Sequence, residues 1–208
     1  PCKLRSPTLP MPESCELYWV NRDASFSFHN ASERFLSNVM SLFVSSHYKN
    51  TPNDLMIMSD APAHHVFVLS PPIDPEAPAG LPDVFVAIQV ALEGALNKES
   101  VQQALTRGLK PAGDLVPWTM ATQFLDSDFG VLSGARIVRI ATHQAVQRKG
   151  YASEAVKQLV AWFENKMGIN NDESSSEEEE EEENKSENEN IKSENENLLT
   201  EQVKPKST

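Results

Sequence analysis

The stretch Gly134–Glu164, GARIVRIATHQAVQRKGYASEAVKQLVAWFE, decides the fold of this chain. Apolar β-branched residues near its start predict a short buried strand. A glycine-containing turn, Gln147–Ala152, follows, and apolar residues then recur at helical spacing, which predicts a helix over Ser153–Glu164. The apolar residues are Ile137, Val138 and Ile140 in the strand, and Ala155, Val156, Leu159, Val160 and Phe163 in the helix.

A turn of this kind can bind an anion. The first N–H groups of a helix have no intrahelical partner, and the positive end of the helix dipole attracts negative charge. Gly150 lets a ligand approach the backbone, Ala152 and Ser153 are small, and Arg148 and Lys149 add positive charge. The turn therefore indicates a phosphate or pyrophosphate site, although it matches neither the dinucleotide fingerprint nor the P-loop. An ordinary turn between a strand and a helix stays open as the alternative.

The turn resembles the Q/R-x-x-G-x-G/A signature of the GNAT acetyltransferases, which bind the pyrophosphate of acetyl-CoA in this way. Longer blocks resemble one branch of that family, the RNA cytidine acetyltransferases, which make N4-acetylcytidine in ribosomal and transfer RNA. The resemblance runs from about Cys15 to Glu164. The blocks are Glu16–Asp23, Ser46–Leu55, Leu55–Leu69, Ala87–Gly94, Ser100–Thr119 and Phe129–His143.

The resemblance implies an α+β fold, a GNAT-like acetyltransferase domain with a mixed sheet flanked by helices. We expect an irregular linker over residues 1–14, a partial acetyltransferase domain over 15–166 and a disordered acidic tail over 167–208. In the GNAT fold, further strands and a helix follow the helix that ends at Glu164 here, and they complete the CoA cleft. No such elements are evident in the sequence after that residue, so we expect the domain to be incomplete at its C-terminus.

The resemblance also implies the cofactor and the residues that bind it. The main chain of Ile140, Ala141 and Thr142 is expected to pair with the pantetheine arm of acetyl-CoA, as a strand pairs with its neighbour. The turn is expected to hold the pyrophosphate. It departs from the family, which has proline, an aromatic residue and glycine at the places of Gln144, Val146 and Arg148. The turn residues expected to bind the cofactor are Gln147, Arg148, Lys149, Gly150, Tyr151, Ala152 and Ser153.

His47 and Tyr48 are the candidate catalytic residues. A helix is predicted over Ser32–Val44, from a plausible N-cap and apolar residues at helical spacing. In a GNAT fold the first helices border the acceptor side of the cleft, so the end of this helix can face the substrate. His47 and Tyr48 can position a proton there. Alternatively, His47 caps the helix and Tyr48 packs against its edge.

The sequence allows more than one interpretation of several other polar and aromatic residues. His64 and His65 are adjacent, so they point to opposite faces of a strand and cannot hold one metal ion, and we expect no metal site. Trp118 can stack on a base or lie in the core, and the core is the commoner case. Arg136 and Arg139 can contact phosphates or form a solvated face.

Charge and cysteine content exclude some classes of protein. The formal charge is −12, but residues 171–208 contain 14 acidic residues and 4 lysines, so the rest of the chain is close to neutral. A nearly neutral charge does not indicate a basic surface for binding RNA, and it does not exclude RNA as a substrate. Cys2 and Cys15 lack the CxxC spacing and suggest a reducing compartment. No apolar run is long enough to span a bilayer, so we expect no membrane contact.

The expected function is acetyl transfer from acetyl-CoA to the N4 amine of cytidine in rRNA or tRNA. The resemblance implies RNA as the substrate, a location in the nucleus and nucleolus, and a protein adaptor as a further partner. No Walker A pattern occurs in the chain, so we expect these residues not to include the ATPase module that usually precedes this domain in the family. Two alternatives stay open: acetylation of a protein lysine, and an inactive fragment whose acidic tail binds basic partners.

Overall fold

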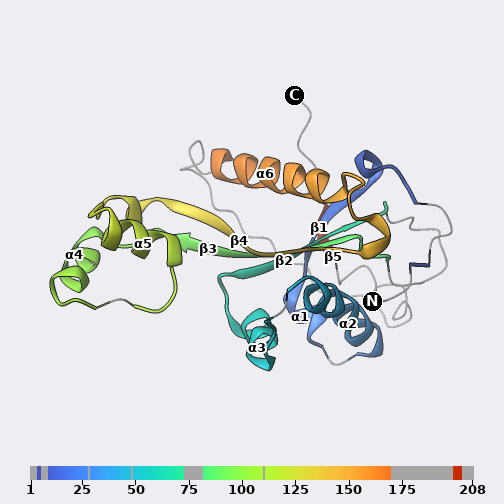
Figure 1. The fold of residues 1–208 in the computed structure, drawn as a ribbon, viewed down its shortest axis with the longest axis horizontal. Helices are drawn as coiled ribbons and strands as arrows, with labels where there is room; N and C mark the ends of the chain where they lie inside the picture. Colours follow the sequence, from blue (N-terminus) through green and yellow to red (C-terminus); the bar gives the residue numbers. More distant parts are fainter. Residues whose placement is uncertain are drawn as a thin grey trace, which may run out of the picture.

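A five-stranded sheet organises the part of the chain that the structure describes. The computed structural model describes residues 4–5, 9–27, 29–47, 49–72, 82–109, 111–169 and 199–202. The strands lie in the order β4-β3-β2-β1-β5, and each pair of neighbours is antiparallel (Figure 1). They are β1 (Glu16–Val20), β2 (His64–Ser70), β3 (Val86–Gly94), β4 (Ser133–Thr142) and β5 (Leu199–Gln202).

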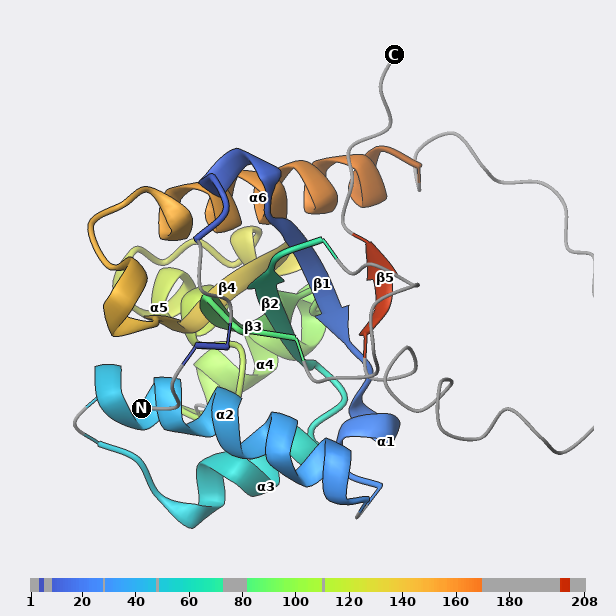
Figure 2. The same cartoon turned by 90° about the vertical axis from the view of Figure 1, so that its right-hand side faces the viewer.

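Helices cover both faces of this sheet. One long helix, α6 (Tyr151–Ile169), lies across one face, and three helices lie on the other (Figures 1 and 2). Those three are α1 (Arg22–Ser25), α2 (Asn30–Ser46) and α3 (Pro52–Asp60). Short 3-10 turns are formed by Pro12–Ser14, Phe129–Val131 and Gln144–Val146.

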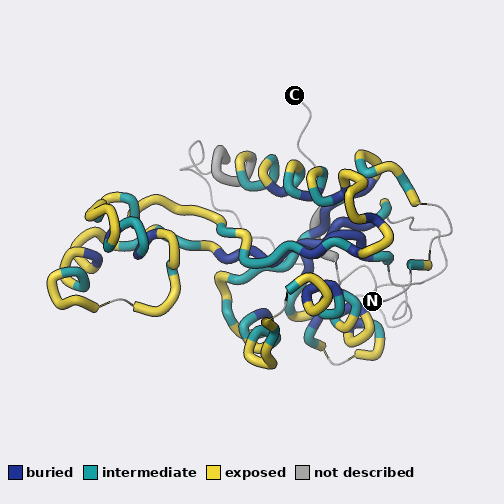
Figure 3. Tube along the Cα trace, viewed as in Figure 1, coloured by how far each residue is buried: buried dark blue, intermediate teal, exposed yellow. Residues whose placement is uncertain are grey.

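The alternation of side chains along the strands divides the core in two. Because successive residues of a strand point to opposite faces, one set packs under α6 and the other under α2. The buried centre of the sheet between these layers is visible in Figure 3. The α6 core includes Leu17, Phe67, Leu69, Phe85, Ile88, Tyr151, Ala155 and Leu159, and the α2 core includes Tyr18, Phe35, Val39, Phe43, Met58, Val68 and Ala87.

Strands β3 and β4 extend beyond their neighbours and carry two further helices. These are α4 (Lys98–Thr106) and α5 (Leu115–Gln123), which together with the ends of the two strands form the arm at the left of Figure 1. Val101, Trp118 and Ala121 form a small core there. Glu93 ties the arm together, because it accepts a hydrogen bond from Arg136 Nε at 2.6 Å and another from the N–H of Val116 at 3.0 Å.

The α+β, GNAT-like fold expected from the sequence is confirmed, with some shifts of boundary. The mixed sheet is wrong for the described strands, because every pair of neighbours is antiparallel. The decisive stretch is a strand, a turn and a helix, but its strand is longer than predicted and its helix begins at Tyr151. The strand is not the buried one that the sequence predicts, because it lies at the edge of the sheet and only Ala141 in it is buried. The predicted helix Ser32–Val44 is α2. Trp118 is 4% exposed and belongs to the core of the arm, so the core interpretation of this residue is the right one.

The range 167–208 contains one regular element that the sequence analysis does not predict. Leu199–Gln202 pairs with β1 and forms an edge of the sheet, and α6 itself extends to Ile169. Residues 170–198 and 203–208 lie outside the described residues, so the tail predicted there stays a prediction. Among the residues that the structure describes, no helix has both the length and the apolar character needed to cross a membrane.

Replacing Gly94 with alanine is expected to destabilise the arm. A Cβ at this position would overlap the carbonyl oxygen of Leu132, and the φ of +97° already disfavours a side chain. Gly113 is a matched control, since its φ is +96° and a Cβ there meets no atom within 4 Å. We expect the free energy of unfolding to fall by about 1 kcal/mol in Gly113→Ala and by about 3 kcal/mol in Gly94→Ala. Urea unfolding measures both, and equal losses would contradict the close contact.

Candidate functional site

The turn between β4 and α6 forms a cradle of backbone N–H groups. The first hydrogen bond of α6 runs from the N–H of Glu154 to the carbonyl of Gly150 at 3.0 Å. The N–H groups of Tyr151, Ala152 and Ser153 therefore have no intrahelical acceptor and point out of the helix end. Together with the helix dipole they provide a site for an anion.

The backbone of the turn is bent so that it adds to this cradle. Arg148 has a φ of +60° and Gly150 a φ of +90°, while Lys149 between them is not in the left-handed region. Alternation of this kind turns successive N–H groups toward one side and makes an anion-binding concavity. Arg148 is not a glycine, so its conformation costs roughly 1 kcal/mol or more, and strain of this kind is typical of functional sites.

Eight of the ten residues predicted to bind the cofactor line one hollow of about 390 Å³. The hollow lies between the end of β4, the turn and the first residues of α6, and Ser46 and Val146 line it as well. Ala141 and Lys149 do not line it. Lys149 instead donates from Nζ to the carbonyl of Ala145 at 2.8 Å. The eight residues are Ile140, Thr142, Gln147, Arg148, Gly150, Tyr151, Ala152 and Ser153.

The outer edge of β4 is open beside this hollow. His143 donates its N–H to the carbonyl of Phe85, the residue before β3, so by the alternation of an antiparallel pair the main chain of Ala141 also faces β3. Ile140 and Thr142 then present their main-chain groups outward, where no strand of the described part pairs with β4. The side chain of Gln147 donates to the carbonyl of Thr142 at 3.2 Å. An extended ligand can therefore pair with the edge at Ile140 and the N–H of Thr142.

His47 closes helix α2, as the alternative interpretation of this residue proposes. Its N–H donates to the carbonyl of Phe43 at 2.9 Å, and its own carbonyl accepts a hydrogen bond from the side chain of Asn50. The capping uses only the main chain, so the imidazole is not occupied by it. The Nε2 atom of His47 is buried and has no partner among the described residues. Tyr48, the other catalytic candidate, lies outside the described residues.

Arg139 is half-buried against helix α3 and does not form the solvated face that the sequence left open. Its Nη2 atom lies 2.8 Å from Oδ1 of Asp54, and its side chain is 13% exposed. The other carboxylate oxygen of Asp54 accepts hydrogen bonds from the N–H and hydroxyl of Thr51 at 2.7 and 3.1 Å, which caps α3. The hydrogen bond from the Thr51 backbone and, next to it, the Arg139 guanidinium hold the pKa of Asp54 below its usual value.

Several buried polar atoms without a partner belong to residues that are linked to this ion pair through the sheet or along the chain. Four of the five such buried side-chain atoms in the described part of the chain belong to His47, Asn50, Gln89 and Arg139. Gln89 stands directly opposite Arg139 in the register of β3 and β4, and its Nε2 atom lies 3.2 Å from Nδ1 of His64. A buried polar group without a partner is costly, so a concentration of them indicates a place where a ligand or water supplies the partners. We call these four residues with Asp54 the acceptor cluster.

Sequence reasoning did not identify Gln89, Asn50 or Asp54 as parts of this cluster. A signal was nevertheless present, because Arg139 and Gln89 are the polar residues within otherwise apolar stretches of β4 and β3. Arg136 likewise forms an ion pair with Glu93, so neither arginine of β4 is an isolated surface charge. The two residues of each ion pair are far apart in sequence, so only the folded structure shows that they are partners.

The histidines and Cys15 named in the sequence analysis do not form one group in the described part of the chain. Among the described residues there is no group of three or more His, Cys, Asp or Glu side chains that could hold a metal ion. His64 and His65 lie on opposite faces, as predicted, since His64 contacts Gln89 and His65 packs edge-on against Trp19. Burial, and then the charge of Glu154, raise the pKa of Cys15 to about 11, so its thiol is protonated at neutral pH and is a poor nucleophile.

Comparison with known proteins identifies the family of this chain. The family model described as GNAT acetyltransferase 2 matches residues 38–208. The chain belongs to this family. The cofactor-binding residues that the resemblance implies in the turn and at the strand edge stay predictions.

Several relatives of this GNAT chain are named RNA cytidine acetyltransferase. One from Dictyostelium discoideum is 51% identical over 209 residues, which is 97% of this chain and 20% of the relative. One from Achlya ambisexualis is 50% identical over 95% of this chain and 52% of the relative. One from Saccharomyces cerevisiae is 55% identical over 76% of this chain and 15% of the relative. The chain thus spans about a fifth of the length of the first of these relatives and about half of the second.

Replacing Asp54 with asparagine tests the ion pair of the acceptor cluster. The pKa of Asp54 is lower in the folded chain than in the unfolded one, so its contribution to stability is present at neutral pH and is lost as the pH falls through the folded pKa. We expect Asp54→Asn to lower the free energy of unfolding by about 1 kcal/mol at pH 7, since the pair is partly exposed.

Urea unfolding at pH 7 and at pH 3 measures this difference, which should shrink at the lower pH. Asp60→Asn at the other end of α3 is the control, because Asp60 forms none of the four ion pairs found among the described residues. A loss in Asp54→Asn that is the same at both pH values would show that the charge of Asp54 is not responsible.

Proposed function

We propose that this chain is the acetyl-transferring part of an RNA cytidine N4-acetyltransferase that uses acetyl-CoA. The observation that carries the proposal is the hollow that joins the N–H cradle to the open edge of β4. A pyrophosphate needs the cradle and an amide-bearing pantetheine arm needs the strand edge, so this pair of features fits coenzyme A better than a simple phosphate. The names of the relatives favour cytidine in RNA over a protein lysine as the acceptor.

The residues of the hollow fit the cofactor. Gly150 has no Cβ, and a Cβ built there would meet only Pro12, at 3.7 Å, so the approach to the backbone is open. The N–H groups of residues 151–153 would hold the pyrophosphate, with Arg148 at the rim. The outward main-chain groups of Ile140 and Thr142 would pair with the pantetheine amides. When bound, acetyl-CoA supplies the acetyl thioester.

The acceptor cluster lies on the α2 side of β4, next to the strand edge. Ser46 of α2 and Ile140 of β4 line the cofactor hollow. Their neighbours in the chain, His47 and Arg139, belong to the acceptor cluster. Because the N4 amine of cytidine is a weak base, holding it in position contributes more than deprotonating it in advance. We assign the positioning to Arg139, Asp54 and Gln89, and the removal of the N4 proton to Nε2 of His47.

The remaining expectations rest on the resemblance. They are the role of Tyr48 beside His47, the choice between rRNA and tRNA, a protein adaptor, and a location in the nucleus and nucleolus. An inactive chain that acts through its acidic tail is the outcome if acetyl-CoA does not bind.

Replacing Gly150 with glutamate should abolish binding of acetyl-CoA. The carboxylate would stand in the cradle and repel the pyrophosphate. Gly150→Ala is the matched control, since it brings the same backbone strain at φ +90° without the charge. We expect at least a tenfold loss of affinity in Gly150→Glu beyond the loss in Gly150→Ala, measured by calorimetric titration of acetyl-CoA into the chain. Equal affinities in the two variants would contradict a pyrophosphate at this turn.

Replacing His47 with glutamine should slow acetylation without weakening acetyl-CoA binding. Glutamine keeps the main-chain cap of α2 but cannot accept the proton, and loss of a general base typically costs roughly 10²–10⁴-fold in kcat. The assay follows N4-acetylcytidine by mass spectrometry in RNA incubated with acetyl-CoA. His29→Gln at the exposed start of α2 is the control and should leave the rate unchanged. An unchanged kcat in His47→Gln would exclude His47 as the base.

A further inference from the structure

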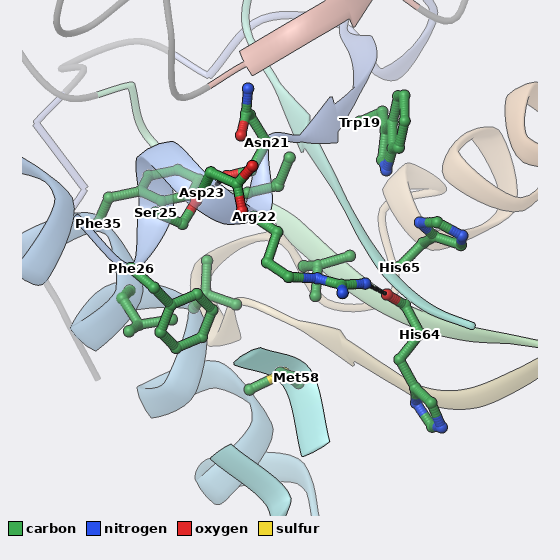
Figure 4. A pocket seen from close by; sticks show the side chains of 14 residues that line it. Trp19, Asn21, Arg22, Asp23, Ser25, Phe26, Phe35, Met58, His64 and His65 are labelled. Carbon is green, nitrogen blue, oxygen red and sulfur yellow. Dashed lines mark hydrogen bonds between the residues drawn. The ribbon is translucent and has the colours of Figure 1, made fainter. Parts of the chain in front are cut away.

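A second hollow lies beside helix α1, on the face of the sheet that carries the acceptor cluster. It has a volume of about 330 Å³ and is enclosed by the end of β1, by α1, by the inner faces of α2 and α3, and by the start of β2 (Figure 4). We call it the α1 hollow. Phe26, Phe35 and Met58 give it apolar walls, and Arg22 and His64 are its polar groups on the sheet side. Its volume is near the lower end for ligand pockets, so it suits one small planar group.

Arg22 crosses the α1 hollow and is held there by the main chain. Its Nη2 atom donates to the carbonyls of His64 and Pro62 at 2.7 and 3.3 Å, and the first of these bonds is drawn in Figure 4. Arg22 belongs to none of the four ion pairs among the described residues. A guanidinium has five N–H donors, so its fixed plane keeps both charge and donors for a ligand. Asp23 also lines the hollow, but it is exposed and screened by water.

His64 connects the α1 hollow to the acceptor cluster. It lines the hollow and contacts Gln89, which stands opposite Arg139 in the sheet. Gln89 stands opposite Val66 and His64 stands opposite Ala91, so His64 lies two strands from Arg139 and two residues further along β2. The pKa of His64 is lowered by burial and next by the charges of Arg136 and Arg22, with Glu93 opposing.

We propose that the α1 hollow binds a nucleotide of single-stranded RNA that lies next to the acceptor cytidine. This inference rests on the proposed function and specifies how the same site holds its substrate. Proteins bind single-stranded RNA by splaying bases onto aromatic rings and arginine planes, with positive charge along the backbone. Phe26 supplies the ring, Arg22 contacts the phosphate or stacks beside it, and the path through His64 and Gln89 leads to the acceptor cluster.

Binding of a labelled RNA tests the inference. The probe is a single-stranded RNA of eight nucleotides with one central cytidine, and fluorescence anisotropy gives its Kd for the 208-residue chain between 50 and 300 mM KCl. Arg22→Gln keeps an amide donor for the carbonyls but removes the charge. It should weaken binding and lower the slope of log K against log salt by about 0.7, the value for one phosphate contact on a single strand.

Phe26→Leu keeps an apolar side chain but removes the ring. It should weaken binding roughly 5- to 50-fold and leave the salt slope unchanged, because stacking carries no charge. Arg107→Gln, an exposed arginine at the end of α4 on the arm, is the matched control for charge and should change neither quantity. A general loss of folding would not lower the salt slope in Arg22→Gln while it leaves the salt slope of Phe26→Leu unchanged.

The inference is overturned if Arg22→Gln and Phe26→Leu both bind the RNA with the affinity and salt slope of the unmodified chain. It is also overturned if the unmodified chain does not bind the RNA. These outcomes are distinct from failure of the proposed function, which is decided by acetyl-CoA binding in the Gly150 variants and by formation of N4-acetylcytidine. If both variants still acetylate RNA and bind it with the Kd of the unmodified chain, the proposed function stands. The α1 hollow then has no part in binding the RNA.

Discussion

The antiparallel pairing of β3 with β4 is the constraint on which the site depends. Nine residue pairs, from Val86 with Thr142 to Gly94 with Ser133, fix the position of every functional residue of β4, and the register shifts once between Gln89 and Val90. The pairing occupies one edge of β4 and leaves the other edge open. It also ends where the cofactor turn begins, so the turn is held at the corner of a rigid sheet.

The period of two along β4 then separates the two chemical tasks that we propose for this strand. Ile140 and Thr142 face the hollow and direct their main-chain groups outward, whereas Arg139 and Ala141 face the α2 side. A single strand can thus bring a cofactor to its edge and an acceptor to its face. The shift of register near Gln89 lies beside Arg139, and a bulge there increases the local twist of the strand and changes the direction of its side chains. Arg139 reaches Asp54 of α3 from this point.

The strand, the turn and helix α6 could be predicted because their signals are local. Apolar periodicity specifies the strand and the helix, and the small residues at Gly150 and Ala152 specify an open helix end. The acceptor cluster could not be predicted in this way. Arg139 and Asp54 are far apart in sequence, and Gln89 meets Arg139 only through strand register. The sequence allowed a solvated Arg139 because an arginine in a strand is usually exposed. In the sequence, the only sign of the α3 cap that holds Asp54 is the spacing of three residues between Thr51 and Asp54.

Net charge is a poor guide to how this chain meets a polyanion. Most of the formal charge of −12 lies after residue 170, while Arg22, Arg136 and Arg139 are arranged on or beside one face of the sheet. Two of these arginines are paired with carboxylates, which cancels their charge at a distance but leaves their remaining donors in place. Attraction on that face therefore acts at short range, through fixed guanidinium planes, and not through a long-range basic field. A site of this kind can select how a nucleotide is oriented, because the donors of an arginine held by main-chain carbonyls have fixed directions before the ligand arrives.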